Sequence, residues 1–240
     1  MTERKTLLEA YRERPYRNIF FALLAVILVD ALAPNAGARG LFSDLMVATA
    51  LVAALVETVR ARHNALWALV LGLPAILARV VAAFRPDTTA QNTTVLTLSM
   101  MFFVFLIWNL LHDLYAGERS TGERIFGALC AYIFIGLLFA LIFAHLEYRD
   151  PGSFNVSNEL LAERVAGESA QLQVFTYFSF VTMTTLGYGD ITPVAEHART
   201  LAWLEALLGQ LFLAVMVAGF VAQHISERIR KRRDDLPPDG

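Results

Sequence analysis

The sequence predicts an all-α membrane protein with six transmembrane helices and a re-entrant helix between the fifth and the sixth. Hydrophobic residues make up 56% of the 240 residues, more than a soluble domain usually carries. Six apolar runs approach the roughly 20 residues that a helix needs to cross a bilayer. A further apolar run, between the last two, is too short to cross and is interrupted by glycines. The six longer runs cover residues 18–33, 41–59, 64–84, 94–114, 124–146 and 200–225.

The distribution of lysine and arginine predicts how these runs are oriented. Cytoplasmic loops retain positive charge, and most of the basic residues fall on one side if residues 1–17 are cytoplasmic. This arrangement predicts a multi-pass protein of the cell membrane with both termini cytoplasmic and residues 147–199 facing outward. Arg79 lies inside the third run, where it is expected to reach an interface or to pair with an acidic residue of a neighbouring helix.

Two short signals predict where helices begin. Ser120 is followed three residues later by Glu123, which is typical of a capping box at the start of the fifth helix. Thr192 followed by Pro193 favours a helix start just before the sixth run, because proline is well placed at the first helical position. The polar connection before the fifth run, residues 115–123, is expected to be a cytoplasmic linker.

The short apolar run, residues 171–190, is the segment most informative about function. It is interpreted as a re-entrant helix that ends near Met183 and is followed by an extended loop. Irregular backbone occurs at membrane depth only where protein covers it or a water-filled cavity faces it, so the loop indicates a pore. Gly187 and Gly189 can adopt positive φ, which would let successive carbonyl groups turn toward one axis. The partial negative charge at the end of the preceding helix would favour a cation nearby.

The nine residues from Thr182 to Asp190, Thr-Met-Thr-Thr-Leu-Gly-Tyr-Gly-Asp, closely resemble the signature sequence of potassium channels. The resemblance extends from the fifth run through the sixth, about a third of the chain. It implies a selectivity filter that binds K⁺ through Thr185, Leu186, Gly187, Tyr188 and Gly189, with K⁺ held at the first four. Leu186 departs from the valine usual in the family. One filter segment per chain implies a fourfold homotetramer, because a single chain supplies one quarter of each oxygen ring.

The resemblance also implies which residues support the filter and which move. Thr184 and Asp190 flank it. Tyr177 and Phe178 stand where voltage-gated relatives commonly carry two tryptophans, and they are expected to form an aromatic collar behind Tyr188. We further expect the hydroxyl group of Tyr177 to hold Asp190 at the outer mouth.

Gly209 follows Gly189 at a spacing similar to that of the hinge glycine in potassium channels. It is either a hinge or a site of close helix packing. Below it, four small or apolar residues recur at helical spacing and are candidates for a constriction that closes by dewetting. These residues are Ala214, Val217, Ala218 and Val221.

The expected organisation is therefore a cytoplasmic segment (1–17), a four-helix transmembrane domain (18–114), the linker (115–123), a pore domain (124–226) and a basic tail (227–240). The fourth run lacks the regularly spaced arginines of voltage sensors, which predicts weak or no voltage gating. The tail either binds anionic lipid headgroups or only anchors the topology.

No paired-carboxylate, nucleophile or metal-ligand arrangement suggests an enzyme, and no cofactor other than permeant K⁺ is expected. The expected partners are further copies of the chain, K⁺ and membrane lipids, without nucleic acid. Two other functions stay open: a non-conducting regulatory subunit of a channel, and a secondary cation transporter, although paired repeats are not visible.

Overall fold

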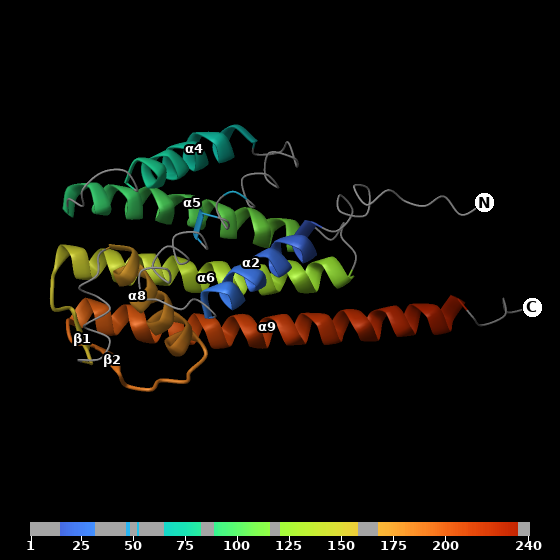
Figure 1. Cartoon of the computed structure of the whole chain (residues 1–240). Coiled ribbons are helices and arrows are strands. Elements are labelled where there is room, and N and C mark those ends of the chain that lie inside the picture. Colours follow the sequence, from blue (N-terminus) through green and yellow to red (C-terminus); the bar gives the residue numbers. More distant parts are fainter. Residues whose placement is uncertain are drawn as a thin grey trace, which may run out of the picture.

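The computed structural model describes residues 15–31, 47–48, 52, 65–82, 89–115, 121–157 and 168–234. Within these ranges the chain is helical apart from one small antiparallel sheet and the turns and loops at residues 150–153, 157, 184–190 and 194–195. Figure 1 shows α4, α5, α6 and α9 lying roughly side by side, with the shorter α8 packed against α6 and α9. The elements are α2 (Pro15–Ala31), α4 (Ala65–Ala82), α5 (Thr89–Tyr115), α6 (Thr121–Arg149), β1 (Phe154–Val156), α8 (Glu168–Met183), β2 (Ile191–Pro193) and α9 (Glu196–Asp234).

Three of these helices are long and apolar enough to cross a membrane: residues 93–114, 122–149 and 196–222. They coincide with the fourth, fifth and sixth apolar runs, so the prediction of an all-helical membrane protein is confirmed to that extent. The first and third runs form the shorter apolar helices Tyr16–Leu28 and Leu66–Val81. The second run, 41–59, lies almost wholly outside the described residues.

The predicted helix start at Pro193 is wrong. Residues Ile191–Pro193 form β2, which pairs with β1 so that Phe154 lies opposite Pro193 and Val156 opposite Ile191. In a two-stranded sheet each strand is an edge, and proline is tolerated there because it has no N–H to donate. The backbone N–H groups of Val194 and Ala195 then donate to the carbonyl of Ser153, and α9 begins only at Glu196.

Helix α9 extends beyond the sixth apolar run. It continues to Asp234 and thereby includes all five basic residues of the predicted tail, 227–240. The cause is local: residues 226–233 contain no glycine or proline that would stop a helix, and Lys and Arg are good helix formers.

The predicted capping box of Ser120 and Glu123 stays a prediction, and Glu123 has a further contact. Helix α6 begins at Thr121, and Ser120 lies outside the described residues. The Glu123 Oε2 atom accepts a hydrogen bond of 3.0 Å from the backbone N–H of Tyr16, in the first turn of α2. Helix N-termini carry free N–H groups and partial positive charge, which a carboxylate satisfies. The hydroxyl of Tyr16 donates to Asp113 near the end of α5, so these three helix ends lie together.

The arginine of the third run, Arg79, is partly buried and contacts a serine. Arg79 Nε in α4 donates to Ser99 Oγ in α5 over 3.3 Å. This contact joins α4 and α5, which pack along one another (Figure 1). Pairing with an acidic residue had been one expectation from the sequence, and the hydroxyl of Ser99 is an acceptor for one of the guanidinium N–H groups.

A cluster of four phenylalanine rings fixes α8 and the small sheet to α6. Phe154 of β1 has its ring centroid 4.8 Å from that of Phe175 and 5.4 Å from that of Phe178, and Phe143 of α6 lies 5.1 Å from Phe178. All three pairs are edge to face, the favoured arrangement of aromatic rings. The turn before β1 is held by Glu147, whose two carboxylate oxygens accept the N–H groups of Gly152 and Phe154. These ring contacts therefore hold α8 against α6 and β1.

Candidate functional site

The loop after α8 is folded back onto the carboxyl end of that helix. The N–H of Thr185 donates to the carbonyl of Thr182 over 2.9 Å, and the N–H groups of Leu186 and Gly187 donate to the carbonyl of Val181 over 2.9 and 3.3 Å. A trans peptide is planar, so each carbonyl points opposite to the N–H of the following residue. The carbonyls of Thr184, Thr185 and Leu186 therefore point away from α8.

The backbone of this loop has positive φ at alternate residues. The angle is 61° at Thr185, 56° at Gly187 and 81° at Gly189. Positive φ at both glycines was expected from the sequence and is confirmed. At Thr185 it was not expected, because positive φ is rare for a β-branched residue and carries a conformational cost. Strain of this kind is commonly held at functional sites by the surrounding structure.

The loop is not covered by its own chain. Residues 184–189 are all exposed, including Leu186 at 54% and Tyr188 at 66%. Exposed apolar side chains of this size on a membrane protein are typical of a contact with another protein chain or with lipid. Thr184 is tied back to α8, because its hydroxyl donates to the carbonyl of Phe180 over 2.6 Å.

Asp190, at the end of the loop that precedes β2, accepts two hydrogen bonds. Its Oδ2 accepts a hydrogen bond of 2.5 Å from the hydroxyl of Tyr177, and its Oδ1 accepts the N–H of Ile191 over 3.0 Å. The contact expected between Tyr177 and Asp190 is therefore present. Partial burial, together with the bond to Asp190, raises the pKa of Tyr177 to about 12 from 10.0. The hydroxyl thus stays protonated and able to donate across the physiological range.

Tyr177→Phe tests the hydrogen bond to Asp190. If the loop lines a K⁺ pore, as its resemblance to potassium channels implies, removing the hydroxyl should free Asp190 and speed slow inactivation of the K⁺ current roughly fivefold, the effect of about 1 kcal/mol for a partly exposed hydrogen bond. Because the pKa is raised, the bond in the unmodified chain should persist below pH 10.0 and be lost as the pH rises through about 12. Patch or bilayer recordings of current decay provide the measurement. Asp190→Asn should add little to Tyr177→Phe if the two groups act as a pair, and fully additive effects would contradict the pairing.

The other expected collar residue, Phe178, is buried and packs against Phe143 and Phe154 rather than standing beside the exposed Tyr188. Tyr177 and Phe178 are adjacent in a helix and so point about 100° apart. Within one chain, Tyr177 therefore reaches the loop, whereas Phe178 supports α8 from the side of α6.

Two glycines let α6 and α9 approach the carboxyl end of α8 closely. A Cβ atom on Gly209 of α9 would lie 2.6 Å from Met183 Cγ and 2.8 Å from the Met183 carbonyl oxygen. A Cβ on Gly136 of α6 would lie 2.9 Å from Phe180 and 3.0 Å from Met183. Of the two interpretations of Gly209, close packing has direct geometric support. The Tyr132 hydroxyl adds a 3.4 Å contact to the Met183 carbonyl.

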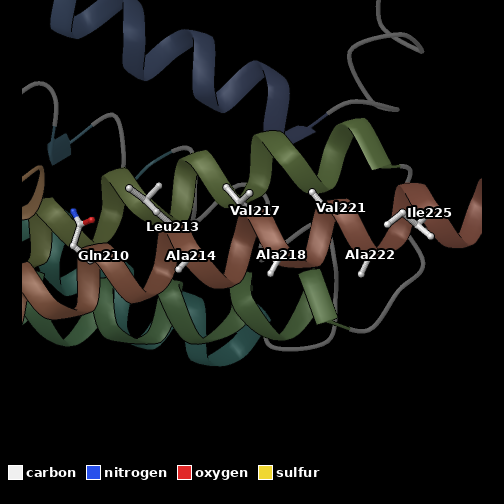
Figure 2. A pocket seen from close by; sticks show the side chains of 8 residues that line it. All are labelled: Gln210, Leu213, Ala214, Val217, Ala218, Val221, Ala222 and Ile225. Carbon is white, nitrogen blue, oxygen red and sulfur yellow. The ribbon is translucent and has the colours of Figure 1, made fainter.

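The four candidate constriction residues lie on one exposed stripe of α9. Figure 2 shows Ala214, Val217, Ala218 and Val221 along this stripe. It is a shallow apolar groove that is nearly uncovered by the rest of the chain, and it is completed by Gln210, Leu213, Ala222 and Ile225. A stripe with spacings of three and four residues is typical of a helix that packs against a neighbouring helix.

Sequence reasoning missed a buried acid. Glu205 lies in α9 with a fully buried side chain, and its Oε1 is 2.5 Å from the hydroxyl oxygen of Ser179 in α8. A signal for it was present, since an ionisable residue within an apolar span is by default a functional candidate. Among the described residues, no group of three or more His, Cys, Asp or Glu side chains could hold a metal ion.

Comparison with known proteins agrees with this geometry. Residues 160–225 match the model of a family described as ion channel. The chain is 33% identical over 94 residues to two pore potassium channel c of Oryza sativa subsp. japonica, covering 39% of this chain and 17% of that protein. It is 44% identical over 72 residues to the inward rectifier potassium channel Kirbac3.1 of Paramagnetospirillum magnetotacticum, covering 27% of this chain and 24% of that protein. No solved structure matches the chain significantly.

The match covers α8, the loop and most of α9, and this part of the chain is similar to the ion channel family. Together with the two potassium channels among its relatives, the match supports the potassium channel family that the loop sequence resembles. The chain is a helical membrane protein with a segment similar to ion channels. It spans about a quarter or less of the length of these relatives.

Proposed function

We propose that this chain is one subunit of a potassium-selective channel in which K⁺ moves passively through a tetrameric pore. The observation that carries the proposal is the loop after α8. Its N–H groups are turned back onto the helix, its φ angles alternate in sign, and the carbonyls of Thr184, Thr185 and Leu186 therefore face outward from the chain. Carbonyl oxygens in rings are what a K⁺ filter uses in place of the hydration shell.

In the proposed filter, four copies of the loop surround one axis. The carbonyls of Thr185, Leu186, Gly187 and Tyr188, with the hydroxyl of Thr185, form stacked oxygen rings that hold K⁺, and Gly189 lets the backbone turn at the outer end. Helix α8 ends at Met183, so its partial negative charge favours a cation below the filter.

The extent of uncovered surface on α9 supports assembly into a homotetramer. Only 11% of the apolar part of α9 is buried within the chain, compared with 56% for α6. The exposed face carries the stripe of Figure 2, and one chain supplies only a quarter of each ring. A closed ring of four identical subunits covers this face and completes the filter. In that assembly Ala214, Val217, Ala218 and Val221 converge as the inner constriction.

Six membrane crossings are supported by the positions of helix ends. The start of α2 and the end of α5 lie together, through the contacts of Tyr16 with Glu123 and Asp113. The seven steps from Ala82 to Thr89 reach about 25 Å at most, too short to cross a bilayer about 30 Å thick, so α4 ends on the side where α5 begins. If α2, α4 and α5 each cross, residues 32–64 must cross as well. Both termini are then on the same side, which the basic residues mark as cytoplasmic.

Voltage should have little effect on this channel. Helix α5, at the position of a voltage sensor, contains no arginine or lysine, and each charge that moves through the field contributes about 2.3 kcal/mol per 100 mV. We therefore expect the conductance of purified channels in planar bilayers to vary shallowly with voltage. A steep rise over a few tens of millivolts, persisting without blocking ions, would show that another charged element senses the field.

Flux from lipid vesicles tests the proposed function. Purified chain in vesicles loaded with K⁺ should release K⁺ down its gradient, with little Na⁺ release and with block by Ba²⁺. Transport driven against a gradient by a second ion would favour the secondary transporter. A particle with the mass of four subunits that gives no flux under any pH, voltage or lipid composition would favour the non-conducting subunit, as would conduction that requires a different channel chain.

The basic end of α9 is proposed to bind anionic lipid headgroups, with topological anchoring as the alternative. Arg228, Arg230, Lys231, Arg232 and Arg233 supply its positive charge. Comparing vesicles with and without anionic lipid in the flux measurement distinguishes these two roles.

A further inference from the structure

Glu205 occupies an unusual position for an acidic residue. It lies within residues 196–222, the part of α9 able to cross a membrane, and its side chain is fully buried. The elements packed against α9 are α6, α8 and β2. A carboxylate buried at such depth is unfavourable unless it is paired with a positive group or made neutral by a proton.

The hydrogen-bonding geometry around Ser179 indicates that Glu205 is neutral. The hydroxyl oxygen of Ser179 lies 2.7 Å from the carbonyl oxygen of Gly136 in α6 and 2.5 Å from Glu205 Oε1. A serine hydroxyl has one proton, and a carbonyl oxygen can only accept. Both contacts are hydrogen bonds only if Ser179 donates to Gly136 and Glu205 donates to Ser179, which requires a proton on the carboxyl group.

The second carboxyl oxygen supports the same assignment. Glu205 Oε2 is buried and has no hydrogen-bond partner among the described residues. An unpartnered oxygen is far less costly in a neutral acid than in an anion. Among the described residues, Tyr132 of α6 is a titratable side chain that interacts electrostatically with Glu205. It is a phenol, which cannot supply a compensating positive charge.

We propose that Glu205, as the neutral acid, is a positioning residue that holds α8 between α6 and α9 and thereby keeps the loop at residues 184–189 in its conducting form. The inference rests on the proposed function. Ser179 lies one helical turn before Met183, where the loop begins. At Gly136 and Gly209, α6 and α9 approach the same end of α8 closely. Loss of the proton would place an anion between packed helices and break the bond that Glu205 donates. K⁺ conduction should therefore fall as the pH is raised.

Infrared spectroscopy of the protein in lipid vesicles tests the proton directly. At neutral pH the C=O stretch of a protonated carboxyl group should be present in the unmodified protein and absent from Glu205→Gln. Glu147→Gln is the matched control, because Glu147 is also buried but its two carboxyl oxygens accept the backbone N–H groups of Gly152 and Phe154; it should leave the band unchanged. A neutral-pH spectrum that Glu205→Gln does not alter would overturn the assignment.

The positioning role is tested by the pH dependence of K⁺ flux. Glu205→Gln keeps a neutral donor, so it should conduct as the unmodified chain does at neutral pH and lose most of a several-fold decline at alkaline pH. Ser179→Ala should reduce flux several-fold at neutral pH. Tyr132→Phe should retain the alkaline decline, which excludes titration of the phenol. Parallel declines in the unmodified chain and Glu205→Gln would refute the role of Glu205 while leaving the channel function intact.

Amide hydrogen exchange separates failure of this inference from failure of the proposed function. If no variant conducts, the channel proposal fails. The positioning of the loop is then read from exchange at residues 184–187, compared between variants at equal pH. At alkaline pH these amides should exchange several-fold faster in the unmodified chain than in Glu205→Gln, and equal rates would contradict the positioning role.

Discussion

Gly187→Ala is expected to abolish the preference for K⁺ over Na⁺. Gly187 has a φ of 56°, and an L-residue with a side chain pays about 1–2 kcal/mol to adopt that left-handed conformation. No described residue of the chain lies within 4 Å of the Cβ position, so the cost arises from the backbone rather than from a clash. In the proposed tetramer four subunits would carry the cost together, and relief of the strain would rotate carbonyl groups out of the proposed rings. Ratios of K⁺ to Na⁺ flux from vesicles give the result.

A matched control separates selectivity from general destabilisation. Gly152 also has positive φ, at 94°, and also has nothing within 4 Å of its Cβ position, but it lies in the turn before β1. Gly152→Ala should incur a similar backbone cost and leave the K⁺ preference unchanged. If both alanine variants keep the preference, the loop after α8 does not act through its backbone conformation.

Gly209→Ala should reduce K⁺ flux by about tenfold or more. The added Cβ would meet Met183 Cγ at 2.6 Å and the Met183 carbonyl at 2.8 Å, and the backbone carbonyl cannot move without displacing the start of the loop. Overpacking of this kind costs about 1–3 kcal/mol. Flux and thermal unfolding of the purified protein should both be measured, since the account predicts a large loss of flux with at most a moderate loss of stability.

Gly219→Ala is the control in the same helix, because nothing lies within 4 Å of its Cβ position. It should leave flux near that of the unmodified chain. The comparison also separates the two interpretations of Gly209. A second-site change, Met183→Ala, removes the side-chain contact at 2.6 Å but leaves the backbone carbonyl in place. It should therefore restore part of the flux to Gly209→Ala if packing is the cause, and none if Gly209 acts as a flexible hinge.

The elements predictable from sequence were those that repeat a pattern over many residues. The runs at 94–114, 124–146 and 200–225 predicted α5, α6 and α9 because a membrane span needs an unbroken apolar stretch. The ends were less predictable. Proline is suited both to the start of a helix and to an edge strand. The sequence around Pro193 does not distinguish the two, and its pairing with Phe154 decides for the strand.

The site shows the same division between local pattern and tertiary contact. The glycines of the loop and the end of α8 at Met183 follow from residue type, and the bond between Tyr177 and Asp190 was inferred from a family resemblance. The contacts of Glu205 with Ser179 and of Gly209 with Met183 join residues 26 positions apart in both cases. No spacing rule within a single helix identifies such pairs, because they depend on how α9 crosses α8.

The proposed channel function depends most on K⁺ selectivity at the loop after α8. A reversal potential measures that selectivity directly. Purified channels in a planar bilayer, with K⁺ on one side and Na⁺ at equal concentration on the other, should reverse far from zero. The shift should be about 59 mV for each tenfold ratio of permeability to a monovalent ion, in the direction that K⁺ alone would give. A reversal potential near zero, from currents that are clearly carried by this protein, would contradict the account.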